Sequence, residues 1–165
     1  MMQPTPLPAA PGQESVWDYP RPPRLEVVDA RVTITLDGQV IASTRDVMRV
    51  LETSHPPVYY VPIEEFVPGT VVPTGGSSFC EFKGSARYYD LLSGPTRAAR
   101  AAWEYPSPAP GYEPLAGRVA VYAGLVDACT VDGERVEPQP GGFYGGWITS
   151  NVVGPFKGGP GSMGW

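Results

Sequence analysis

Residues 31–42 decide the fold class, and they read Arg31-Val32-Thr33-Ile34-Thr35-Leu36-Asp37-Gly38-Gln39-Val40-Ile41-Ala42. Polar and apolar residues alternate through the first six positions, so an extended strand there would bury one face and leave the other in water. Asp37-Gly38 follows, and a second β-rich run leads away from it. Two such runs joined by Asp-Gly predict a β-hairpin with a type I′ turn.

A similar hairpin is predicted near the far end of the chain. Residues 119–122 and 125–131 are typical of strands, and Asp132-Gly133 turns the chain into residues 134–136. Between the two hairpins lie shorter extended runs, which Pro-Pro, Pro-Gly and Gly-Gly breaks separate: residues 47–51, 58–61, 78–82 and 86–92.

Two segments carry helical signals. Pro62–Phe66 is predicted to form one helical turn with proline at its first position. Residues 96–103 stay ambiguous, since their Ala and Arg favour a helix whereas their short length and β neighbours favour a strand. Many short strands separated by turns predict a mostly-β fold, a small antiparallel β-sandwich or barrel-like domain with one or two short helical turns.

Composition divides the 165 residues into three parts. Residues 1–24 hold seven of the 21 prolines and are predicted to be an extended leader, disordered in part. Residues 25–138 form the β-rich domain. Residues 139–165 are rich in glycine but also carry Phe143, Tyr144, Trp147, Phe156 and Trp165. A flexible linker would lack these aromatics, so we expect this arm to pack on the domain or on a second subunit.

The charge and cysteine content narrow the function classes. A formal net charge of −5 without a cluster of Lys or Arg argues against binding to nucleic acid or to an anionic membrane. No apolar stretch approaches the roughly twenty residues that span a bilayer. The beginning of the chain shows no secretory signal, so we expect a cytoplasmic protein in which Cys80 and Cys129 are reduced.

The motifs of common cofactor and metal sites are missing. The sequence contains no CxxC pair, no phosphate-binding glycine loop and no GxSxG elbow, and it has a single histidine, His55. We therefore expect neither a metal nor a bound cofactor. His55 has two interpretations: it is a general base oriented by Glu52 or Asp90, or it has a structural role in a turn, which we favour.

Three segments, taken in their order along the chain, resemble the sequence pattern of a known family. They are Val50-Leu51-Glu52-Thr53 with Pro57-Val58-Tyr59-Tyr60-Val61-Pro62, then Cys80-Glu81-Phe82-Lys83-Gly84-Ser85-Ala86-Arg87-Tyr88-Tyr89, then Ala102-Trp103-Glu104-Tyr105-Pro106. From about Ala30 to Val136 the chain resembles the bacterial family called domain of unknown function 427, and residues 141–165 resemble the tail of its longer form. The resemblance implies a small mostly-β domain but no known reaction.

Polar and aromatic members of that pattern suggest a shared pocket. Its candidate residues are Glu52, Tyr60, Cys80, Lys83, Tyr89, Trp103 and Tyr105. On a single strand Cys80 and Lys83 would point to opposite faces, whereas Glu52 and Lys83 would compensate each other's charge in a common pocket.

Two functional hypotheses follow. The first is a pocket that binds a small molecule and could be catalytic. The second is a non-enzymatic binding or assembly module, such as a homodimer, that uses the aromatic arm.

Overall fold

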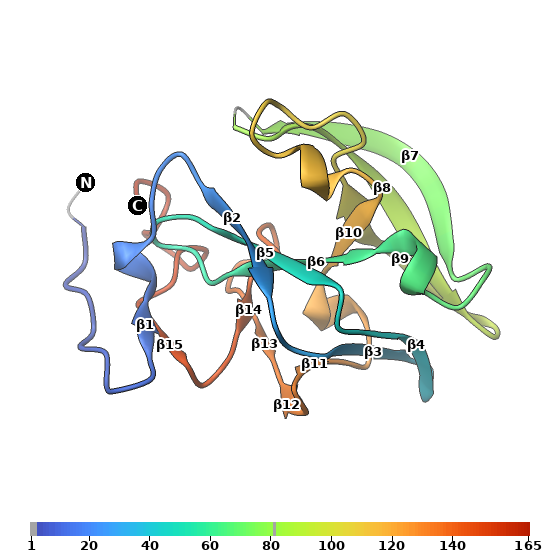
Figure 1. Cartoon of the computed structure of the whole chain (residues 1–165), viewed down its shortest axis with the longest axis horizontal. Coiled ribbons are helices and arrows are strands. Elements are labelled where there is room, and N and C mark those ends of the chain that lie inside the picture. The colour runs from blue at the N-terminus through green and yellow to red at the C-terminus, as the bar shows by residue number, and fades with distance from the viewer. Residues whose placement is uncertain (1–2, 81) are drawn as a thin grey trace.

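The computed structural model describes residues 3–80 and 82–165, and its regular secondary structure consists mainly of β-strands (Figure 1). A seven-stranded sheet has the order β2-β5-β6-β10-β9-β8-β7, and a four-stranded sheet has the order β12-β11-β3-β4. The strands of the large sheet are β2 Arg24–Val28, β5 Val47–Leu51, β6 Val58–Pro62, β7 Val71–Cys80, β8 Gly84–Ser93, β9 Thr96–Glu104 and β10 Arg118–Val121. Those of the small sheet are β3 Val32–Leu36, β4 Gln39–Thr44, β11 Ala128–Val131 and β12 Glu134–Arg135.

The remaining elements are short. Two-residue strands pair β1 Glu14–Ser15 with β15 Val152–Val153 and β13 Glu137–Pro138 with β14 Trp147–Ile148. Single 3-10 turns occur at Val16–Asp18, Ile63–Glu65, Glu113–Leu115 and Ala123–Leu125. In the described part of the chain, no helix has the length and apolar character needed to cross a membrane.

Both Asp-Gly hairpins are confirmed. Asp37 and Gly38 join β3 to β4 with φ angles of 53° and 71°, and Asp132 and Gly133 join β11 to β12 with 48° and 83°. Positive φ at both central residues defines the type I′ turn, whose twist matches that of the flanking strands. The local signal was sufficient here because the turn and its strands are contiguous in sequence.

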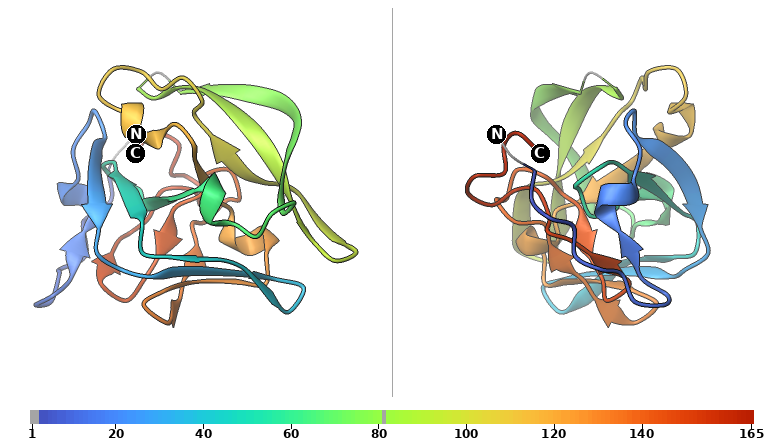
Figure 2. Two further views of the ribbon diagram at one scale, coloured as in Figure 1. Left: turned by 45° about the vertical axis from the view of Figure 1, so that its right-hand side comes forward. Right: turned by 90° about the vertical axis from the view of Figure 1, so that its left-hand side faces the viewer.

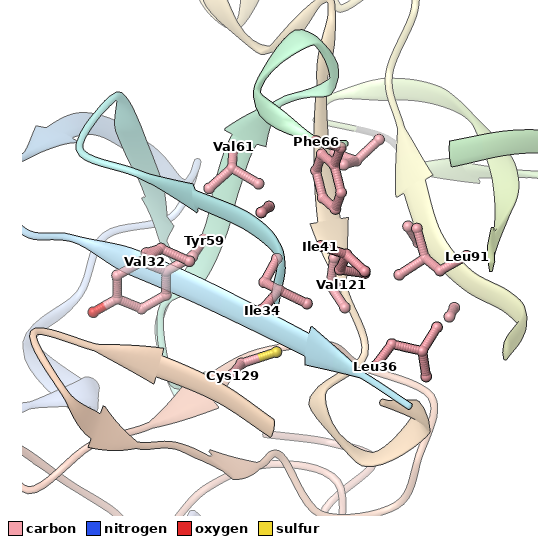
Figure 3. Packing of buried hydrophobic residues seen from close by; sticks show 14 of the residues in the cluster. Val32, Ile34, Leu36, Ile41, Tyr59, Val61, Phe66, Leu91, Val121 and Cys129 are labelled. Carbon is pink, nitrogen blue, oxygen red and sulfur yellow. The ribbon is translucent and has the colours of Figure 1, made fainter. Parts of the chain in front are cut away.

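The two sheets pack face to face as a mostly-β sandwich, the fold class expected from the sequence (Figure 3). Val32, Ile34 and Leu36 come from the small sheet, and they meet residues such as Val61 and Leu91 of the large sheet. Cys129 lies in this core, where burial raises the pKa of its thiol to about 12. It therefore acts as a small apolar side chain.

The ambiguous segment at residues 96–103 is a strand. It forms most of β9, which pairs with β8 on one side and with β10 on the other. Three of its alanines, Ala98, Ala101 and Ala102, belong to the core between the sheets, and the last two are fully buried. The tertiary position between two strands therefore overrides the helical propensity of Ala and Arg.

The arm, residues 139–165, lies against the body of its own chain and beside the leader, as the red and blue segments of Figure 2 show. Trp147 is its main anchor: it is 1% exposed, its ring stacks on Tyr59 at 5.1 Å between centroids, and its Nε1–H donates to the Val121 carbonyl at 2.9 Å. Trp17 of the leader donates its Nε1–H to the Pro155 carbonyl and packs against Trp165.

We predict that Trp147→Ala lowers the free energy of unfolding by about 3–5 kcal/mol, because it leaves a cavity in the core and removes a buried hydrogen bond. Urea denaturation measures this loss. Phe143→Ala, at a position 73% exposed in the same arm, is the matched control and should change stability by less than about 0.5 kcal/mol. Equal effects of the two changes would show that the arm is not anchored through Trp147.

Candidate functional site

A pocket of about 300 Å³ lies where the arm covers the outer face of the large sheet, the face turned away from the small sheet. It brings together six of the seven side chains that the sequence suggested: Glu52, Tyr60, Cys80, Lys83, Trp103 and Tyr105. Most of its lining is apolar, with a few polar groups, which is typical of sites for small molecules.

Strand alternation decides which aromatic residues reach this pocket. In β6, Tyr59 packs into the core between the sheets and Tyr60 faces the pocket. In β8, Tyr88 lies opposite Trp103 of β9 and faces the pocket, whereas Tyr89 lies opposite Ala102 and faces the core. Successive side chains of a strand point to opposite faces.

Tyr89 is therefore not a pocket residue, contrary to the expectation from the sequence. Its hydroxyl donates to Glu104 Oε1 at 2.5 Å on the core side of the sheet. The burial of Tyr89 and this bond raise the pKa of its hydroxyl to about 12, so it stays a hydrogen-bond donor at neutral pH.

Cys80 and Lys83 reach the same pocket, although strand alternation predicted opposite directions for them. β7 ends at Cys80, Phe82 and Lys83 lie in a tight turn, and β8 begins at Gly84. The chain reverses between the two residues, so the rule for a single strand does not apply. Gly84, at a φ of 107°, completes the turn in a conformation that favours glycine.

Lys83 is the most unusual charged group of the pocket. Its side chain is only 8% exposed, and its Nζ lies 5.8 Å from the centre of the Tyr105 ring. Within the described residues, no carboxylate lies within 4 Å of this amino group and no hydrogen-bond acceptor contacts it. A nearby aromatic face attracts a cation but leaves its hydrogen-bonding capacity unused.

Glu52 does not pair with Lys83, so the expected compensation between them is wrong. Its Oε2 lies 3.4 Å from Nε of Arg21 and 3.5 Å from Nε2 of His55. Arg21 belongs to the leader, which the sequence analysis had left out of the site. The negative charge of Glu52 is thus offset locally by groups other than Lys83.

The tautomer of His55 follows from its neighbours. The backbone N–H of Gly146 donates to Oε1 of Gln139 at 3.0 Å, which identifies that atom as the amide oxygen. The Gln139 amide nitrogen then donates to the Lys157 carbonyl at 2.8 Å and to Nδ1 of His55 at 3.0 Å. Because Nδ1 accepts, the imidazole proton lies on Nε2 and points to Glu52.

Electrostatics keep His55 neutral. Burial lowers the pKa of His55 to about 4; Glu52 opposes this shift, while Lys157, Arg21 and Lys83 reinforce it. With both ring nitrogens engaged, His55 offers no free lone pair to a substrate. Asp90, the other partner considered for it, does not line the pocket and instead accepts from Arg97 and from the backbone N–H of Arg100 at 2.8 Å. The structural role of His55 is the one these contacts support.

The arm contributes residues that sequence reasoning did not assign to the pocket: Phe143, Tyr144, Gly145 and Lys157. A Cβ atom at Gly145 would overlap the Trp103 ring, so only glycine allows the arm to approach this closely. The Tyr122 hydroxyl donates to the Phe143 carbonyl at 3.0 Å and fixes the arm at the pocket mouth. The aromatic composition of the arm was the one signal in the sequence that could have indicated this contact.

The described residues contain no group of three or more His, Cys, Asp or Glu side chains that could hold a metal ion. The described groups that line the pocket include aromatic rings, two lysines, one carboxylate, the Cys80 thiol and the His55 imidazole. Such an arrangement can bind and orient a small molecule.

Comparison with known families gives one match. A family model described as "Domain of unknown function (DUF427)" matches residues 24–132. No curated protein matches the chain. The matched region contains the body's share of the pocket, whereas Gln139 and the pocket residues of the arm lie beyond it.

We predict that protonation of His55 destabilises the protein. The pKa is lower in the folded chain, at about 4, than the ordinary 6.5, so the unfolded chain binds the proton more readily between these pH values. This contribution is fully present above pH 6.5 and is lost as the pH falls toward 4, at a total cost of about 3 kcal/mol.

The single histidine makes the measurement direct. Its Cε1–H proton resonance in the folded protein should titrate near pH 4, and in His55→Gln the free energy of unfolding should fall less between pH 7 and pH 5 than in the unmodified protein. A titration midpoint at or above 6.5 would contradict the buried, neutral imidazole.

Proposed function

The chain belongs to the family described as domain of unknown function 427, and on that premise we propose, from the pocket's own chemistry, that it binds a small anionic molecule between its body and its arm. The observation that carries the proposal is Lys83, a residue only 8% exposed whose amino group contacts no described carboxylate. An ammonium that is largely withdrawn from water gains from an anion or from several acceptors beside it. The described residues around Lys83 provide neither, and its Nζ keeps some contact with solvent, since no fully buried side-chain nitrogen in the described part of the chain lacks a partner. An anionic ligand would supply that partner.

The other charged groups around Lys83 also favour an anionic ligand. Lys157 of the arm also lines the pocket, with its Nζ 5.6 Å from the centre of the Tyr144 ring and 3.3 Å from the Trp165 carbonyl. The only described carboxylate in the lining, that of Glu52, is offset by Arg21 and by the His55 N–H. The local field is therefore positive in a protein whose net charge is −5.

The pocket is a better explanation of the arm than an assembly surface. Trp147, the more deeply buried of the two tryptophans of the arm, already packs in the core of its own chain, and four other arm residues line the pocket. A homodimer formed through the arm stays a prediction, and light scattering of the purified protein tests it.

We predict that carboxylates and phosphates that fit the pocket raise the melting temperature. A ligand at one hundred times its Kd adds about 2.7 kcal/mol, which corresponds to a rise of roughly 5–10 °C for a protein of this size. The measurement is a thermal-shift panel that includes benzoate, phenyl phosphate, pyrophosphate and inorganic phosphate, together with native mass spectrometry of molecules that copurify.

The variants isolate the role of Lys83. Lys83→Met should abolish the rise. Arg45→Met removes one positive charge from an exposed turn outside the pocket and should retain it. An equal rise in Lys83→Met, or no response and no copurifying molecule at all, would refute anion binding in this pocket.

A further inference from the structure

The aromatic residues of the chain are concentrated at the pocket. The sequence contains four Trp, nine Tyr and five Phe, and nine of these eighteen residues line this one cavity. They come from separate segments: Tyr60 from β6, Tyr88 from β8, Trp103 from β9, and Tyr144 from the arm. An anion alone would need only the lysines. Burial in the second apolar cluster accounts for Tyr60, Trp103 and Tyr105, but it does not account for the exposed rings.

The rings at the mouth are not explained by folding. Phe79 and Phe143 line the pocket with 75% and 73% of their surface exposed, which gains little from burial. Deeper in, Trp103 and Tyr122 lie 4.7 Å apart with a tilt of 44°, and Tyr144 meets His55 edge to face at 4.7 Å. The pocket thus offers aromatic surface from its mouth to its interior.

Each of the two ammonium groups lies over the face of a tyrosine ring. Lys83 Nζ lies 5.8 Å from the Tyr105 centroid on the body, and Lys157 Nζ lies 5.6 Å from the Tyr144 centroid on the arm. A flat ring that packs among the aromatic walls next to either lysine therefore places a carboxylate or phosphate substituent within reach of an ammonium. Aromatic pairs contribute about 0.5–1.5 kcal/mol beyond the area that they bury.

We propose that the ligand is a planar aromatic anion, a ring system that carries a carboxylate or phosphate and inserts between the body and the arm. This inference rests on the proposed function and adds that the anionic ligand carries an aromatic ring. The cavity of about 300 Å³ lies at the lower end of ligand pockets and suits a small aromatic ring system better than a large cofactor.

Three matched probe molecules distinguish the contribution of the ligand's aromatic ring to affinity from the contribution of its negative charge. Isothermal titration calorimetry compares 2-naphthoate, its neutral carboxamide, and decahydronaphthalene-2-carboxylate, which keeps the charge but lacks the flat ring. We expect 2-naphthoate to bind at least tenfold more tightly than either of the others.

Two variants in the arm test whether the aromatic ring of the ligand packs against Tyr144. Tyr144→Leu keeps apolar bulk but removes the aromatic face, and it should weaken 2-naphthoate binding by about three- to tenfold. Phe156→Leu changes an arm aromatic that does not line the pocket, and it should leave the affinity within twofold.

The outcomes distinguish this inference from the proposed function. Equal binding of the saturated and aromatic carboxylates, or an unchanged affinity in Tyr144→Leu, overturns the aromatic ligand and leaves the anion site standing. Equal binding of the carboxamide and the carboxylate overturns the anion site. Failure of all three probes, together with a response of the protein to inorganic phosphate or pyrophosphate, also overturns the aromatic ligand.

Discussion

The side-chain amide of Gln139 holds the site together. Its oxygen accepts from Gly146, and its nitrogen donates to the Lys157 carbonyl and to His55 Nδ1. One buried amide thus closes the arm on itself and joins it to the body. It also sets the imidazole tautomer that directs the Nε2 proton of His55 toward Glu52. Because an amide can make these bonds in only one orientation, the position of the arm and the tautomer of His55 are linked through Gln139.

A second constraint is the two-faced character of the large sheet. Its inner face packs on the four-stranded sheet and forms the core, and its outer face carries the second apolar cluster and the pocket. The adjacent pairs Tyr59-Tyr60 and Tyr88-Tyr89 each place one ring on either side. Stability and recognition are therefore encoded in alternate positions of the same strands. A change at an inward position acts on folding, and a change at the next residue acts on the pocket.

The sequence was informative where the determinants are local. The Asp-Gly turns and the mostly-β fold could be predicted, and six of the seven candidate residues line one pocket. The structural role of His55 stays a prediction. Tyr89 was assigned to the wrong face because a pair of adjacent tyrosines does not reveal its own register. The directions of Cys80 and Lys83 were predicted as if both residues lay on a single strand, although Lys83 falls between two predicted strands. Tyr144, Lys157 and Gln139 were missed because their contacts with the body span long separations, 84 residues for Gln139 and His55.

The central claim is that the body and the arm form one binding site. Hydrogen exchange read by mass spectrometry, with and without saturating 2-naphthoate, tests it most directly. The account predicts that amides at residues 82–84 of the body and 143–147 of the arm slow together, since one molecule contacts both. Protection confined to the body, with exchange in the arm unchanged, would contradict the claim.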